Sequence, residues 1–147
     1  MNRDEFIEAY YKTAKRALFI ADKVRKMGFL SVEEDLDREK FQKRDVFEYG
    51  LRFVIDGTDR DVIDDLLSNI VNQEKDEYLR LLKTMQKKAV LLIQDGSSPI
   101  IVFAFMNSYT DLSLKEDESE KVLDELGNLK YIPAEDNIDK EEEEKNG

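Results

Sequence analysis

Residues 4–27 read DEFIEAYYKTAKRALFIADKVRKM, and the spacing of their apolar side chains decides the fold class. Apolar residues recur at steps of three and four, which places them on one face of an α-helix. Further apolar residues widen this stripe, so we expect the helix to be covered on more than one side. The stripe consists of Ile7, Tyr10, Tyr11, Ala14, Leu18 and Ala21, and it is widened by Phe6, Ala17, Phe19 and Ile20.

The sequence that follows this helix predicts a break and then a short acidic helix. Gly28 is expected to end the first helix, because glycine readily adopts the left-handed conformation found at helix C-termini. Ser31 and Glu34 have the spacing of a capping box, which predicts a short helix over residues 32–37. Residues 37–45 are interpreted as a polar connection.

A compact apolar stretch comes next. Residues 46–56, VFEYGLRFVID, offer several large side chains for a core, and the helix they form is expected to end at Asp56 and Gly57. Thr58 or Asp59 is then expected to cap the following helix, where acids favour the positive end of the helix dipole.

Residues 58–95 are predicted to form one long helix. An apolar stripe occurs on both sides of a polar lapse at residues 72–77, and neither glycine nor proline interrupts the segment. We therefore favour a single helix of about 50 Å, at 1.5 Å per residue. The polar residues 72–77 would form one or two helical turns that are exposed to solvent and do not contact the core.

A break is predicted over residues 94–99, QDGSSP, and its proline begins PIIVFAFM at residues 99–106, the longest apolar run of the chain. Periodicity cannot distinguish a buried helix from a strand here. We favour a helix because the chain offers no partner strand. The segment is expected to be buried in the core or to form a homo-oligomer contact through Ile100–Met106.

The C-terminal part of the chain is expected to contain one more helix and a tail. Ser113 and Glu116 form a second capping-box pattern, which predicts a helix that ends near Leu126. Residues 127–147 are predicted as an acidic tail, disordered because its charged end cannot bury enough apolar surface to offset the entropy of ordering.

These segments together predict an all-α helical bundle with a long N-terminal helix, short helices, a long return helix and a disordered acidic C-terminal tail. The predicted domain organisation is one helical domain over residues 1–126, made of 1–94 and a helical appendix at 95–126, followed by the tail at 127–147.

Composition limits the possible functions. The 147 residues carry a net charge of −11 and include no histidine and no cysteine, so the usual general base and thiolate chemistry are missing. An acidic chain lacks the basic face of a nucleic-acid binder. A membrane-spanning helix needs about 20 apolar residues, far more than residues 99–106 provide, so no transmembrane span and a cytoplasmic location are expected. We expect no enzyme activity, no cofactor and no bound metal.

The acidic residues allow two interpretations as a metal site. A calcium loop that begins at Asp56 would need glycine at its sixth position and glutamate at its twelfth, but Asp61 and Leu67 occupy them. A magnesium-dependent all-α nucleotide hydrolase remains the alternative function, because some acids are spaced three residues apart on helices. The acid pairs in question are Asp61 with Asp64 and Glu74 with Glu77.

Two motifs in order resemble the cytoplasmic segment of the MotA family of flagellar stator subunits. The first is ADKVRKMGFLSVEED at residues 21–35, and the second is YGLRFVIDGTDRDVIDDLL at residues 49–67. The resemblance covers roughly residues 6–99. Family members have four membrane spans, whereas residues 99–106 here are too short for one. The matching positions are Arg25, Gly28, Phe29, Leu30, Ser31 and Glu33 in the first motif, and Gly50, Leu51, Val54, Ile55, Asp56, Gly57 and Asp59 in the second.

The resemblance implies a non-enzymatic, soluble, stator-like protein that docks on a flagellar rotor or stator component. In that family, charges around the glycine of the first motif face the rotor switch protein, and Arg25 and Glu33 fall on those positions. A general helical adaptor unrelated to motility remains a further alternative. The expected partner-binding residues are Arg25, Lys26, Glu33 and Glu34, and the expected structural residues are Gly28, Asp56, Gly57 and Asp59.

Overall fold

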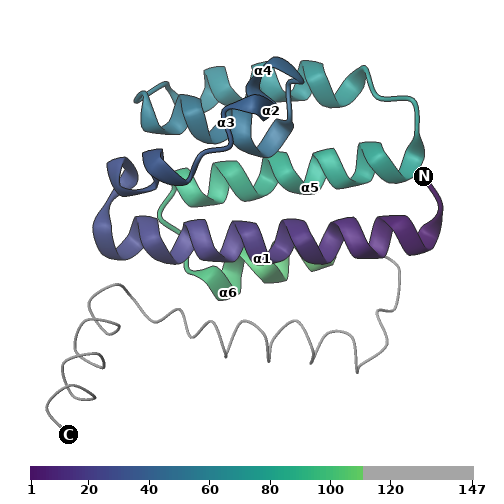
Figure 1. Cartoon of the computed structure of the whole chain (residues 1–147), viewed down its shortest axis with the longest axis horizontal. Helices are drawn as coiled ribbons and strands as arrows, with labels where there is room; N and C mark the ends of the chain where they lie inside the picture. Colours follow the sequence, from purple (N-terminus) through teal and green to yellow (C-terminus); the bar gives the residue numbers. More distant parts are fainter. Residues whose placement is uncertain (111–147) are drawn as a thin grey trace, which may run out of the picture. The chain divides into compact units, whose positions relative to one another are not determined.

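The computed structural model describes residues 1–110 of the chain, and Figure 1 shows that they form an all-α fold. The predicted fold class is therefore confirmed. The helix expected from Ser113 to Leu126 and the predicted tail lie outside the described residues. In chain order, the elements are α1 (Arg3–Met27), the 3₁₀-helix η1 (Phe29–Asp35), α2 (Glu39–Gln42), α3 (Val46–Ile55), α4 (Arg60–Asn72), α5 (Glu77–Gln94) and α6 (Pro99–Ser108).

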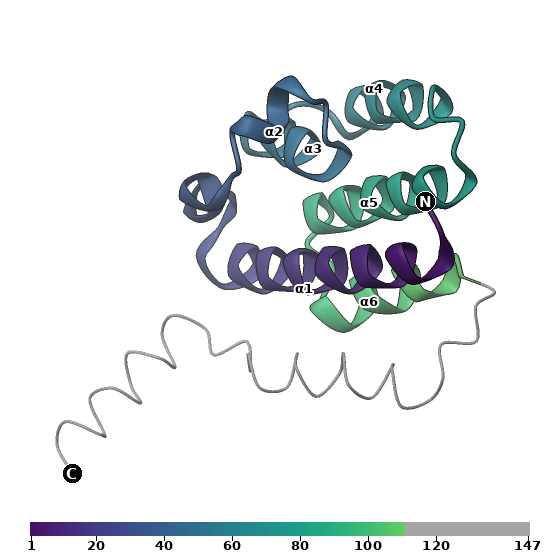
Figure 2. The ribbon, with the colours of Figure 1, turned by 45° about the vertical axis from the view of Figure 1, so that its right-hand side comes forward.

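Helix α5 lies at the centre of the fold. It packs against α1 and α6 on one side and against α3 and α4 on the other, as Figures 1 and 2 show from two directions. Its C-terminal half is surrounded by neighbours, so that five consecutive residues, 89–93, are buried. The core therefore forms around α5 and not around α1, although α1 is the longest helix.

Helix α1 begins with a complete capping box. The Asn2 side chain accepts the Glu5 N–H at 2.8 Å, and the Glu5 carboxylate accepts the Asn2 N–H at 3.2 Å. The helix is covered by α5, α6 and η1, as the wide apolar stripe predicted. Its buried residues are Phe6, Tyr10, Ala14, Ala17, Leu18, Ile20, Ala21 and Val24.

The prediction of one helix over residues 58–95 is wrong. Helix α4 ends at Asn72 and α5 begins at Glu77, and the two helices pack against each other. The polar lapse is a turn in which side chains bind the backbone: the Glu74 carboxylate accepts the Lys75 N–H at 3.0 Å, and Asp76 caps α5 by accepting the Leu79 N–H at 2.9 Å. Such local bonds compete with helix hydrogen bonds and end the helix.

The predicted capping by Ser31 is also wrong. Residues 29–35 form the 3₁₀-helix η1 in place of an α-helix over 32–37, and no side chain caps its N-terminus. The Ser31 hydroxyl instead donates to the Gly28 carbonyl at 2.6 Å. Asp59 occupies the N-cap position of α4, but its side chain makes no capping hydrogen bond.

Residues 99–108 are helical, as we favoured. The Ser98 hydroxyl accepts the Ile101 N–H at 3.3 Å, and Pro99 stands in the first turn, where its missing N–H costs nothing. Only one face of α6 is buried, through Val102, Phe103 and Met106, and Ile100, Ile101 and Phe105 are exposed in the single chain. Among the described helices, none has the length and apolarity that a membrane crossing requires.

Candidate functional site

Gly28 positions the region that the sequence singled out. Its φ of 87° and ψ of 169° lie where residues with a Cβ are strained. A Cβ there would meet nothing within 4 Å, so the constraint is on the backbone and not on space. The Gly28 N–H donates to the Val24 carbonyl at 2.8 Å, which closes α1 while the chain turns directly into η1.

We define the charged corner as residues 25–35, the end of α1 with Gly28 and η1. Three large apolar side chains are exposed on it: Leu30 is 73% exposed, Met27 48% and Phe29 36%. Basic residues precede these side chains in the sequence and acidic residues follow them. The corner therefore combines exposed apolar side chains with charges of both signs.

The structure gives the four expected partner-binding residues different surroundings. Arg25 is exposed and has no ion pair with any described residue. Lys26 pairs with Asp22 one turn earlier on α1, at 3.0 Å. Glu33 lies 3.9 Å from Arg38, a loose and largely exposed pair. Glu34 is also exposed, and its partner is a different lysine of α1.

That lysine, Lys23, fastens η1 to α1. Its Nζ lies 2.8 Å from the Asp35 carboxylate and 2.9 Å from the Glu34 carboxylate. The hydrogen bond to Asp35 raises the pKa of Lys23 above its ordinary value, so the cation persists to a higher pH than that of a free lysine. Some of the opposite charges on the two sides of Gly28 therefore pair with each other, through Lys23. Arg25 takes no part in these pairs, so it can interact with solvent or with a partner.

A buried ion pair holds the corner to the rest of the fold. The Glu48 side chain of α3 is only 3% exposed, and it receives Arg16 Nε at 2.7 Å and a second guanidinium nitrogen at 3.1 Å. It also accepts the Asp37 N–H at 3.1 Å, and Arg16 donates to the Asp35 carbonyl. Removing one partner of a fully buried pair costs about 3–5 kcal/mol, and the cost here is lower because Arg16 is 30% exposed.

Sequence reasoning missed this pair. The available signal was the acidic residue Glu48 within the largely apolar run of residues 46–55. Its partner Arg16 lies 32 residues away, beyond the reach of any helical periodicity. We call the ion pairs of Lys23 with Glu34 and Asp35 the Lys23 clamp. Sequence reasoning missed it for the same reason, because these contacts depend on the turn at Gly28.

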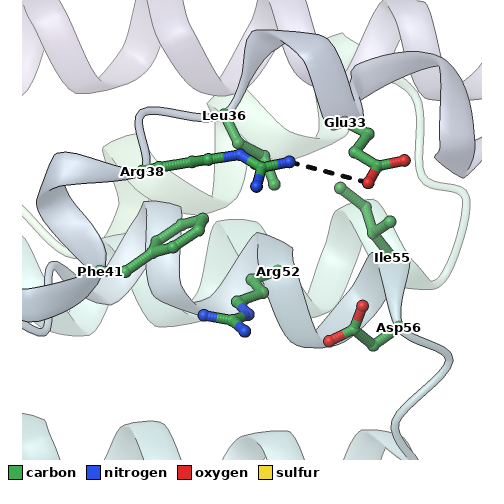
Figure 3. A pocket seen from close by; sticks show the side chains of 7 residues that line it. All are labelled: Glu33, Leu36, Arg38, Phe41, Arg52, Ile55 and Asp56. Carbon is green, nitrogen blue, oxygen red and sulfur yellow. Dashed lines mark ion pairs between the residues drawn. The ribbon is translucent and has the colours of Figure 1, made fainter.

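The surface beside the charged corner contains two pockets. A shallow depression of about 450 Å³ is lined by corner residues and Arg38. A deeper pocket of about 190 Å³ lies between η1, α2 and α3, and we call it the Arg52 pocket (Figure 3). Glu33 and Arg38 line both, so the pockets share an edge. The Arg52 pocket is lined by Glu33, Leu36, Arg38, Phe41, Arg52, Ile55 and Asp56.

The expected structural residues of the second motif lie at the turn between α3 and α4. Gly57, with φ of 80°, donates to the Val54 carbonyl at 3.1 Å, and Thr58 donates to the Phe53 carbonyl at 3.0 Å. This bonding pattern is a Schellman motif. Asp56 is the last residue before the glycine, and its carboxylate faces the Arg52 pocket (Figure 3).

Two of the four helical acids that suggested magnesium pair with lysines of α5. Asp64 lies 3.0 Å from Lys87, whose hydrogen bond lowers the Asp64 pKa. Glu74 lies 2.9 Å from Lys83, which lowers the Glu74 pKa in the same way. Within residues 1–110, no group of three or more acidic, histidine or cysteine side chains converges as a metal site would require.

Comparison with protein-family models, with curated proteins and with solved structures finds no match to this chain.

Proposed function

We propose that the chain is a non-enzymatic protein that docks on a protein partner through its charged corner. The observation that carries this proposal is the exposure of Met27, Phe29 and Leu30 together on one corner, among charges of both signs. Clustered exposed apolar side chains are typical of interaction sites. An apolar centre with a charged rim is the usual composition of a protein–protein interface.

The corner is also prepared for binding. The Lys23 clamp and the Arg16–Glu48 pair fix η1 against α1 and α3 before any partner arrives. A surface that is already ordered loses less conformational entropy on association. The Arg25 side chain, which has no ion pair within the described residues, retains its charge for a partner.

The sequence motifs support a particular class of partner. They resemble the stator segment whose charges face the rotor, so we propose a flagellar rotor or stator component, contacted from the cytoplasm at the periphery of the motor. Arg25 and Glu33 would then meet an acidic and a basic residue of that partner. The docking proposal depends on the corner itself, whereas the link to motility depends on the motif resemblance.

Charge reversal tests the proposal. Arg25→Glu and Glu33→Arg should each weaken binding to the motor component and impair motility, because each places like charges opposite one another. Reversal at a rim position acts mainly on the association rate and its salt dependence. Surface plasmon resonance at two salt concentrations measures both quantities, and a compensating reversal on the partner should restore part of the loss.

Arg80→Glu provides the matched control, since Arg80 is exposed on α5 outside the corner. It makes the same charge change and should leave binding unaltered. The proposal fails if the corner variants bind and move as the parent does. It also fails if they lose binding only because they unfold, which circular dichroism would reveal.

A further inference from the structure

The Arg52 pocket has the chemistry of a binding site for an acidic side chain. Its apolar lining comes from Leu36, Phe41 and Ile55, and four charged side chains surround the opening (Figure 3). In Figure 3, Arg52 on α3 and Asp56 just after its end lie across the opening from the Glu33–Arg38 pair. The two cations thus lie on different sides of one small pocket whose lining is partly apolar and partly charged.

Arg52 is presented in a form suited to a carboxylate. Its Cζ lies 5.2 Å from the centre of the Phe41 ring, so the aromatic ring supports the guanidinium. No described residue accepts a hydrogen bond from the guanidinium or pairs with it. A guanidinium held on a ring keeps its N–H groups available for bidentate binding of a carboxylate.

One stretch that contributes to the pocket is basic, although the protein is acidic overall and the pocket lining itself carries two acids and two bases. Residues 38–44 read REKFQKR, with four basic residues and one acid, against a net charge of −11 for the whole chain. All four basic side chains are exposed, and Phe41 in their midst lines the pocket. This local excess of positive charge complements an acidic ligand.

The end of α2 offers an independent observation. Arg44 has a φ of 54°, in the left-handed region that glycine usually occupies at a helix C-terminus. The Arg44 and Asp45 N–H groups complete a Schellman motif with the Phe41 and Lys40 carbonyls, both at 3.1 Å. An arginine in this position lacks the conformational freedom of glycine, and it adds one more cation to the basic stretch that contains Phe41.

We propose that the Arg52 pocket binds an acidic side chain of a partner protein that is flanked by an apolar residue. Arg52 holds the carboxylate, the lining of Leu36, Phe41 and Ile55 takes the apolar neighbour, and Asp56 accepts a backbone N–H. Glu33 and Asp56 at the opening disfavour a polyanion such as nucleic acid. This inference rests on the proposed function only in that its occupant belongs to a protein.

Titration of the ¹⁵N-labelled full chain tests the proposal directly. The probe is a blocked tetrapeptide of alternating leucine and glutamate, and its counterpart carries glutamine in place of glutamate. The glutamate peptide should shift the amide signals of residues 38–44 and 52–56, and the glutamine peptide should not. Arg52→Gln should raise the Kd by about tenfold, as the loss of a charged hydrogen bond does.

Arg80→Gln removes the same charge elsewhere and should leave the Kd of the peptide unchanged. Arg52→Lys keeps the charge but loses the planar fork, so it should bind the peptide more weakly than the parent does. The inference is overturned if both peptides bind alike, if Arg52→Gln binds as the parent does while its melting curve is unchanged, or if inorganic phosphate competes better than the glutamate peptide.

Peptide binding also separates this inference from the docking of the charged corner. Arg25 does not line the Arg52 pocket. Arg25→Glu should therefore leave the peptide affinity unchanged even where it abolishes capture of the motor component. Weaker peptide binding by Arg52→Gln together with normal corner behaviour supports the pocket alone, and absence of peptide binding in the parent refutes it whatever the corner does.

Discussion

Gly28 and Arg44 both have a positive φ, of 87° and 54°. Glycine adopts a positive φ without steric strain, whereas arginine does not. Gly28 allows the chain to turn from α1 into η1 and so to present Phe29 and Leu30. Arg44 accomplishes a similar turn at the end of α2 with a side chain that strains the backbone. Each turn lies close in the sequence to a proposed binding surface, because Gly28 precedes Phe29 of the corner and Arg44 follows Phe41 of the Arg52 pocket.

Substitutions at these two positions should shift the free energy of unfolding in opposite directions. Gly28→Ala should lower the free energy of unfolding by about 1–3 kcal/mol, because alanine is strained at this φ and ψ. Arg44→Gly should leave it unchanged or raise it by up to about 1 kcal/mol. Urea unfolding measures both variants. Equal stabilities of Gly28→Ala and the parent would show that the turn does not depend on glycine.

At the scale of elements, the sequence predicted the helices that carry a continuous apolar stripe. Residues 4–27 correspond closely to α1, and residues 99–106 lie within α6. The break between α4 and α5 was not predicted, because it arises from side-chain bonds of Glu74 and Asp76 to the backbone and not from glycine or proline. Periodicity reports apolar faces, and it is insensitive to such local polar bonds.

The same limit applies to the site. The corner was located from charges and a glycine in sequence, and the structure shows that Arg25 and Glu33 are exposed there. The Arg52 pocket was not predicted, since it needs residues of three elements, from Glu33 to Asp56, to converge. The Arg16–Glu48 pair was missed because its contact spans α1 and α3.

Helix α6 offers a matched pair of substitutions at the element scale. Phe103 is 7% exposed, and Phe105 is 42% exposed beneath the Lys88 ammonium at 4.8 Å. Phe103→Asp should lower the free energy of unfolding by about 3 kcal/mol or more, since it buries an unpaired charge and leaves a cavity. Phe105→Asp should cost less than about 1 kcal/mol, because the new carboxylate remains in water near Lys88.

Gel filtration of the same two variants addresses self-association, which we propose to occur through the exposed face of Ile100–Met106. If α6 joins two copies, Phe105→Asp should elute as a smaller species than the parent while its melting curve is retained. Identical elution of the two proteins across a range of concentrations would rule out the homo-oligomer. Equal destabilisation by both substitutions would contradict the packing of α6 described above.

At the scale of the whole molecule, the fold places surfaces of different composition next to one another, although the chain is acidic overall. The central α5 organises the other helices, so that the corner at the end of α1 and the Arg52 pocket between η1, α2 and α3 adjoin one another through Glu33 and Arg38. Exposed apolar side chains lie at the corner and a local excess of positive charge lies beside the pocket. This arrangement favours one extended protein-binding region over two unrelated sites.

Site-specific photo-crosslinking in motile cells that produce the chain tests the central claim, that the charged corner docks on a flagellar motor component. Benzoylphenylalanine replaces Leu30 in the corner or Val62 on α4, both exposed large apolar residues whose exchange leaves the core intact. We predict an adduct with a rotor or stator component from position 30, none from position 62, and a reduced yield at position 30 when Arg25→Glu is added. Absence of that adduct from position 30 in a folded protein, or equal adducts from both positions, would contradict the account.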